Sequence, residues 1–198
     1  MKPLIDAVSE DRDVQSILEG IRSGMREQLV SGMVGSSRQV VLASWFYELD
    51  RPFLIVTNNQ FSAQKMADDL IECLSDDLVL LYPANELSVS ETVAASPEIQ
   101  SQRMDVLTQL ARGFRGIVVT PYAGLRKLLP SRDVMAKASF TLQTGDVAPL
   151  EETIEHLHSL GYERTERVER RGDMSVRGGI VDLYPLTQDD AFRIEWFD

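Results

Sequence analysis

The segment Gly32–Gln39 (GMVGSSRQ) has the length of a phosphate-binding loop but lacks most of the residues that such a loop needs. The motif G-x-x-x-x-G-K-[ST] uses its second glycine to let backbone N–H groups wrap the phosphates. Its lysine reaches the terminal phosphates and its hydroxyl binds magnesium. Three of these four positions differ here, and neither arginine nor glutamine replaces the lost group. The residues of this degenerate loop are Gly32, Gly35, Ser37, Arg38 and Gln39.

We expect this loop to be a tight turn from a strand into a helix that binds no ligand, and we expect no ATP hydrolysis by the chain. Weak anion binding at the N-terminus of the helix is the alternative. No other catalytic group is predicted. His156 and His158 are two residues apart on a helix and point away from each other. Cys73 lies in a helical pattern and is expected to be a core residue. The sequence therefore predicts no enzyme activity for this chain, no metal and no cofactor.

The end of the chain, AFRIEWFD (191–198), carries residue types that are common at protein interfaces. In a strand, Phe192, Ile194 and Trp196 share one face, which is expected to be the core face. Arg193, Glu195 and Phe197 then share the other face, and arginine and aromatic residues are enriched at binding hot spots.

The run Arg177-Gly178-Gly179 is expected to interrupt the preceding strand with a bulge or a close backbone approach, which would turn Arg177 towards that outer face. In the alternative, Phe197 packs beneath sequence that follows Asp198. Because Asp198 directly follows a strand pattern, we expect the chain to be a fragment of a longer protein.

Strand and helix patterns alternate over the first two thirds of the chain, which predicts an α/β fold with a parallel sheet. The apolar runs 52–57, 78–82 and 116–120 are expected to be strands covered on both faces. One helical face is predicted from Val14 to Leu29, and a buried helix over 38–49. A helix capped by Asn58 or Asn59 should bury Phe61, Met66, Leu70, Ile71 and Leu74. A helix opened by Ser96-Pro97 should bury Ile99, Met104, Leu107 and Leu110, and another helix is expected over 121–129.

The pattern changes near residue 135, so we predict a parallel-sheet, phosphate-loop-like domain over 1–135 and a small α+β domain over 136–198. The second domain should contain a half-exposed strand at 140–143 and a helix over 150–160 that ends at Gly161. Antiparallel strands are expected at 162–168, 175–184 and 191–197.

The charge of the chain argues against autonomous DNA binding. Acidic residues outnumber basic residues 31 to 20, and the net charge is −11. Proteins that bind nucleic acid usually need a basic surface, because neutralised phosphates supply much of the affinity. An acidic surface suits protein partners better. No apolar run approaches the roughly 18–20 residues that span a bilayer. We therefore expect a cytoplasmic protein that does not bind membranes.

Two stretches resemble the UvrB-like region of bacterial transcription-repair coupling factors. They are MSVRGGIVDLYPLTQDDAFRIEWFD (174–198), which UvrB shares, and LLYPANELSVSETVAASPEIQSQRMDVL (80–107). The similarity extends over essentially the whole chain. The degenerate loop and the lack of an aromatic-rich hairpin between Tyr82 and Pro97 favour the coupling factors over UvrB. An active UvrB-type ATPase or helicase is the alternative.

The resemblance implies an N-terminal, non-catalytic module that recruits UvrA to stalled RNA polymerase in nucleotide excision repair. Its UvrA-binding residues would be Arg177, Arg193 and Phe197. The resemblance assigns no role to Glu195, for which holding Arg193 in place is one option. The whole protein would be an ATP-dependent DNA translocase, and RNA polymerase and DNA would bind to domains downstream of residue 198. Other domains of the full-length protein are further expected partners. In a further alternative, the second domain serves mainly as an internal docking surface that another domain of the full-length protein masks.

Overall fold

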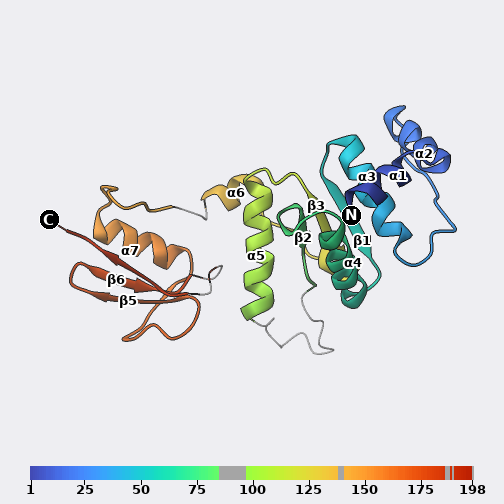
Figure 1. Ribbon diagram of the computed structural model, residues 1–198. Coiled ribbons are helices and arrows are strands. Elements are labelled where there is room, and N and C mark those ends of the chain that lie inside the picture. Colours follow the sequence, from blue (N-terminus) through green and yellow to red (C-terminus); the bar gives the residue numbers. More distant parts are fainter. Residues whose placement is uncertain (85–96, 138–140, 186–187, 189, 198) are drawn as a thin grey trace. The chain divides into compact units, whose positions relative to one another are not determined.

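Figure 1 shows the computed structural model, which describes residues 1–84, 97–137, 141–185, 188 and 190–197. The chain divides into two compact units, Met1–Val93 with Gly113–Leu128 and Ala94–Arg112 with Leu129–Asp198. The first unit has a three-stranded parallel sheet and the second a separate four-stranded sheet. The predicted α/β fold class is therefore confirmed.

This division differs from the single boundary expected near residue 135, because the helix Pro97–Ala111 groups with the second unit. The helix is tied there by Arg132, whose Nε donates to the carbonyl of Ala111 at 2.9 Å, and by Arg171, whose Nη1 donates to Ser101 Oγ at 2.8 Å. An alternating pattern gives the order of elements along the chain but not the sheet on which a helix packs.

In the first unit, one helix packs on a sheet with strand order β1-β3-β2 (Figure 1). The core joins Ala63, Met66, Ala67 and Leu70 of that helix, α4, to Val79, Ile117 and Val119 of the sheet. The α4 helix begins where Asn59 Oδ1 accepts from the backbone N–H of Ser62 at 2.8 Å, so Asn59 is the cap. The elements are α1 (Lys2–Ser9), α2 (Arg12–Arg22), α3 (Ser37–Leu49), β1 (Phe53–Thr57), α4 (Gln60–Cys73), η1 (Asp76–Leu78), β2 (Val79–Leu81), β3 (Ile117–Pro121) and η2 (Tyr122–Leu125).

The α3 helix matches the predicted buried helix and uses two of its sides. Val40 and Ala43 pack against Ile5 and Cys73, while Val41 and Trp45 pack against Val14 and Leu18. The thiol of Cys73 is buried, and burial raises its pKa above the ordinary value, with the nearby Asp69 carboxylate adding to the effect. A raised pKa disfavours the thiolate, so Cys73 is a core residue, as predicted.

The expectation that all three strands are covered on both faces is wrong for β1. This strand lies at the edge of the sheet, and its alternate residues Leu54 and Val56 are 60% and 46% exposed. By contrast, every residue of the central strand β3 is buried. Both strands consist mainly of apolar residues, so position in the sheet decides which one is covered.

Several predicted helical patterns also extend further than the helices do. The α2 helix ends at Arg22, and Gly24 (φ +86°) turns the chain, which leaves Leu29 93% exposed. Phe61 of α4 is 79% exposed because it lies in the first turn, away from the core. The helix expected over 121–129 is only the short 3-10 helix η2.

In the second unit, α7 packs on one face of a sheet with strand order β4-β5-β6-β7 (Figure 1). The core of this unit contains Leu157 of α7 together with Met174, Val181 and Leu183 of the sheet. The elements are α5 (Pro97–Ala111), α6 (Arg132–Lys137), α7 (Leu150–Ser159), β4 (Glu163–Arg164), β5 (Asp173–Arg177), β6 (Ile180–Leu183) and β7 (Phe192–Glu195).

Four expectations for the elements of this unit need correction. The segment 175–184 is a hairpin of two strands, not one bulged strand, and β4 pairs with β5 in parallel. Residues 141–143 are not in a strand, while Phe140 lies outside the described residues. On α5, Met104 and Leu110 are each 39% exposed, and Val106 is the buried apolar residue. The α7 helix and its end before Gly161 (φ +92°) are confirmed.

Within the described ranges, no helix is long and apolar enough to cross a membrane. The same part of the chain contains no group of three His, Cys, Asp or Glu side chains that could hold a metal ion.

Candidate functional site

The outer face of the second sheet carries a cluster of two arginines and one aspartate. The carboxylate of Asp182 on β6 accepts hydrogen bonds from both arginines. Arg177 Nη2 donates to Asp182 Oδ2 at 2.7 Å. Arg193 of β7 binds the same carboxylate through two atoms, Nε to Oδ1 at 2.6 Å and Nη2 to Oδ2 at 3.0 Å. The structure therefore brings together two of the three residues predicted to bind a partner.

The strand register explains this arrangement. Asp182 lies directly opposite Arg193 in the β6–β7 pair, so both side chains stand on one face. Arg177 lies opposite Ile180 in the β5–β6 pair, two residues from Asp182 and on the same face. The neighbouring residues Val181 and Ile194 point to the other face and pack in the core. The predicted division of faces on β7 is therefore confirmed for Arg193 and Ile194.

The two glycines after Arg177 form the turn of the β5–β6 hairpin rather than a bulge. Arg177 pairs with Ile180, which leaves Gly178 and Gly179 as the two turn residues. Gly178 has φ +59°, a conformation that side chains disfavour. At Gly179 the predicted close approach is present, because a Cβ there would lie 3.0 Å from the carbonyl oxygen of Trp196. The tight turn sets the register that makes Arg177 and Asp182 diagonal neighbours on one face of the hairpin.

Charge interactions within the cluster are strong for a surface site. The carboxylate of Asp182 is 16% exposed, while the side chains of Arg177 and Arg193 are 65% and 55% exposed. Hydrogen bonds from Arg193 lower the pKa of Asp182 to about 2, with a further contribution from Arg177. Reciprocally, Asp182 raises the pKa of Arg193. The cluster thus combines one carboxylate with two guanidinium groups and has a formal net charge of +1.

Phe197, the third predicted residue, lies two residues beyond β7 and is 85% exposed. Before it, the ring of Trp196 is fixed by the hydrogen bond from its Nε1 to the carbonyl of Ala148 at 2.6 Å. Within the described residues, no aromatic pair or hydrogen bond involves Phe197. Its ring is thus open to solvent on a backbone held in place by its neighbour.

Sequence reasoning missed Asp182 and considered Glu195, which it left unassigned, as the residue that could hold Arg193 in place. Among the described residues, no hydrogen bond or ion pair joins Glu195 to Arg193. Glu195 adds only a weaker electrostatic effect on the pKa of Arg193. The missing information was the hairpin, since one continuous strand over 175–184 hides the alignment of Asp182 between two arginines.

In the first unit, the degenerate loop leads into α3 but no strand precedes it, so the expected strand-to-helix turn is wrong. Gly32 and Gly35 both have positive φ, at +83° and +57°. The hydroxyl of Ser37 donates to the carbonyl of Val34 at 2.8 Å. Gln39 is buried, and its Nε2 donates to Asp69 Oδ2 at 2.7 Å. The Ser37 hydroxyl is used in a local turn, whereas the Gln39 amide joins α3 to α4.

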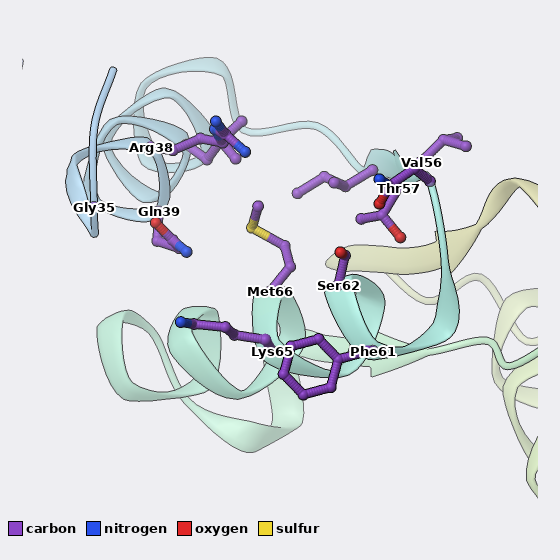
Figure 2. Close-up of a pocket in the computed structure, with 12 residues that line it drawn as sticks. Gly35, Arg38, Gln39, Val56, Thr57, Phe61, Ser62, Lys65 and Met66 are labelled. Atoms are coloured by element: carbon purple, nitrogen blue, oxygen red, sulfur yellow. The ribbon is translucent and has the colours of Figure 1, made fainter. Parts of the chain in front are cut away.

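A pocket of about 560 Å³ lies between the start of α3, the end of β1 and the start of α4. Figure 2 shows Arg38 and Gln39 from α3 and Phe61 and Lys65 from α4 around it. Neither Arg38 nor Lys65 takes part in an ion pair with a described residue. The pocket combines apolar and polar lining residues with two cationic side chains, and the degenerate loop contributes Gly35, Arg38 and Gln39 to it.

Comparison with known proteins agrees with the geometry of the second unit. Residues 140–198 match the family model of the UvrB interaction domain. The chain is 42% identical to a transcription-repair-coupling factor of Bacillus subtilis over 192 residues. This alignment covers 96% of the chain. The resemblance to transcription-repair coupling factors is confirmed.

A second transcription-repair-coupling factor, from Staphylococcus epidermidis, is 33% identical over 199 residues and matches 100% of this chain. The chain spans only 16% of the length of the first relative and 17% of the second. The similarity therefore concerns one region of these much longer proteins, and it includes both compact units.

Proposed function

We propose that the second unit is a docking module for UvrA, and that the chain serves as the UvrA-recruiting region of a transcription-repair coupling factor. The observation that carries this proposal is the arginine cluster on the outer face of the sheet. Two exposed guanidinium groups are held side by side next to a strand end with an exposed phenylalanine. Such a combination suits a protein partner that offers carboxylates and an apolar pocket.

The match to the UvrB interaction domain supports the choice of partner, because the matched segment contains Arg177, Arg193 and Phe197. A surface that UvrB and coupling factors share would present UvrA with the same contacts from either protein. DNA translocation and polymerase binding then belong to parts of the whole protein outside this chain. Other domains of the whole protein would mask the same face until recruitment is needed.

Binding of the 198-residue chain to purified UvrA tests this proposal directly. We expect the parent chain to bind and Arg177→Ala to weaken binding by about tenfold or more, since the variant removes one guanidinium from the cluster. Arg164→Ala is a matched control, because it removes an exposed arginine away from the cluster. Arg164 lies on β4, at the opposite edge of the sheet from β7, and is paired with the core-facing Met174. Absence of binding by the folded parent would contradict the proposal, as would equal losses in both variants.

The alternative, an active ATPase of the UvrB type, is disfavoured by the degenerate loop. Ser37 and Gln39 occupy the glycine and hydroxyl positions. Ser37 is engaged in a local hydrogen bond, and Gln39 is bonded to Asp69 of α4. We expect no ATP turnover above that of an Arg38→Ala variant in a steady-state phosphate-release assay. Turnover that disappears in Arg38→Ala would favour the ATPase.

A further inference from the structure

The Asp182 carboxylate is the centre of the arginine cluster and is shielded by the side chains that it binds. It accepts all three of the cluster's hydrogen bonds, at 2.6, 2.7 and 3.0 Å, so both arginines are bonded to the same carboxylate. Its low exposure, 16%, contrasts with more than half for each arginine. A partner approaching this face therefore meets the guanidinium groups before it meets the carboxylate.

The bonding pattern decides which donors remain for a partner. Arg193 uses Nε and Nη2 on Asp182, so its Nη1 is left, whereas Arg177 uses only Nη2. A guanidinium group carries five N–H donors in a rigid plane, so each arginine can bind Asp182 and a second carboxylate at once. Lysine has no such plane, so its ammonium group cannot bind a carboxylate through two donor atoms in a fixed geometry.

We propose that Asp182 is a positioning residue that orders the two arginines in advance for an acidic segment of the partner. This inference rests on the proposed docking function and deepens it by naming the chemistry recognised: carboxylates bound through the outward N–H donors. A free arginine loses much rotamer freedom when it binds. Here that loss occurs on folding, because the carboxylate already holds both side chains, and binding loses less freedom.

Glu195 provides a matched comparison for charge. It lies on the same face of β7 as Arg193, and its substitution removes the same single negative charge as a substitution at Asp182. It accepts no hydrogen bond from either arginine within the described residues. Asp182→Asn and Glu195→Gln thus change the net charge equally, but only Asp182→Asn alters the hydrogen bonds that hold the arginines.

The first experiment compares the binding kinetics of these two variants with those of the parent chain, using purified UvrA. We expect Asp182→Asn to raise the dissociation rate about tenfold, because the arginines lose their alignment, and to leave the association rate unchanged or higher. Glu195→Gln should change the dissociation rate less than about twofold. Equal dissociation rates for the two variants would overturn the proposal.

A second measurement separates positioning from a merely structural role. Asp182→Asn is introduced into the Arg177→Ala/Arg193→Ala background, where a positioning residue has nothing left to position. We expect no further loss of UvrA affinity in that background, measured as a double-mutant cycle. The same loss in both backgrounds would mean that Asp182 acts through the fold, and the proposal would be wrong.

A third readout does not depend on UvrA, so it distinguishes failure of this inference from failure of the docking function. In the parent chain the Nε–H of Arg193 should give a sharp NMR signal with slowed exchange against water, because it is bonded to Asp182. The signal should broaden or exchange faster in Asp182→Asn but not in Glu195→Gln. An unprotected Nε–H in the folded parent would overturn the positioning role even if UvrA binds. Protection without UvrA binding would refute the docking function while leaving the ordering of the arginines intact.

Discussion

The degenerate loop at the start of α3 and the arginine cluster on the second sheet both stood out in the sequence, yet their polar groups are used in opposite ways. In the loop, Gln39 is buried and bonded to Asp69, and Ser37 closes a local turn. In the cluster, Arg177 and Arg193 remain largely exposed around one carboxylate. A polar residue whose donors are bonded inside the fold contributes to stability. A polar residue that is held at the surface and keeps some N–H donors unbonded can recognise a partner.

The largest effect that this comparison predicts is at Arg193. Arg193→Ala should weaken UvrA binding by about 2–4 kcal/mol, because it removes a doubly bonded guanidinium group and leaves Asp182 underpaired. Arg193→Lys should recover only a small part of this loss, since an ammonium group cannot bind Asp182 through two atoms and also reach a partner. Calorimetry at fixed salt measures both. Full recovery by lysine would show that charge alone matters at this position.

Phe197→Ala should cost about 2 kcal/mol of binding free energy through loss of the exposed aromatic ring. Raising the salt concentration should weaken the parent and the Phe197→Ala variant in parallel, because the ring carries no charge. The Arg193→Ala variant should show a smaller salt dependence than the parent. Phe192→Ala, which alters the half-exposed aromatic residue of β7, serves as the control. A salt dependence that changes with Phe197 would contradict an apolar anchor.

The opposite behaviour is expected for the loop. Gln39→Ala should lower the free energy of unfolding by about 1–2 kcal/mol, because it removes a largely buried hydrogen bond to Asp69 and opens a small cavity. UvrA affinity should stay within about twofold of the parent. Denaturant titration and binding assays on the same samples test the contrast. A large loss of affinity in a stable Gln39→Ala protein would place the loop in the binding function.

The smallest effect concerns pH and stability. The pKa of Asp182 falls from 3.8 to about 2 on folding, so its ion pairs stabilise the native state above pH 4. The free energy of unfolding of the parent should then exceed that of Asp182→Asn by about 1 kcal/mol at neutral pH. The difference is no larger because solvent partly screens the exposed arginines. The difference should shrink as the pH falls below about 4 and vanish only below pH 2, where Asp182 is protonated in both states. Unfolding midpoints of both proteins, measured across this pH range, test this expectation. A stability difference that does not change with pH would show that the ionisation of Asp182 is not its cause.

Much of the fold could be predicted because local patterns have local physical causes. The β2 and β3 strands, the α3 helix and the cap at Asn59 follow from apolar runs and from a side chain that bonds to its own backbone neighbours. The outward position of Arg193 on β7 follows from alternation along one strand. These features need no knowledge of which segments pair with each other.

What only the tertiary structure decided depends on pairing between distant segments. The apolar runs of β1 and β3 look alike, but β1 is at the edge of the sheet and exposes Leu54, while β3 is central and fully buried. The glycines after Arg177 make a hairpin turn rather than a bulge. By itself the sequence determined which residues of each strand share a face. The register of the hairpin placed Asp182 between two arginines, because hydrogen bonding across strands selects which residues become neighbours.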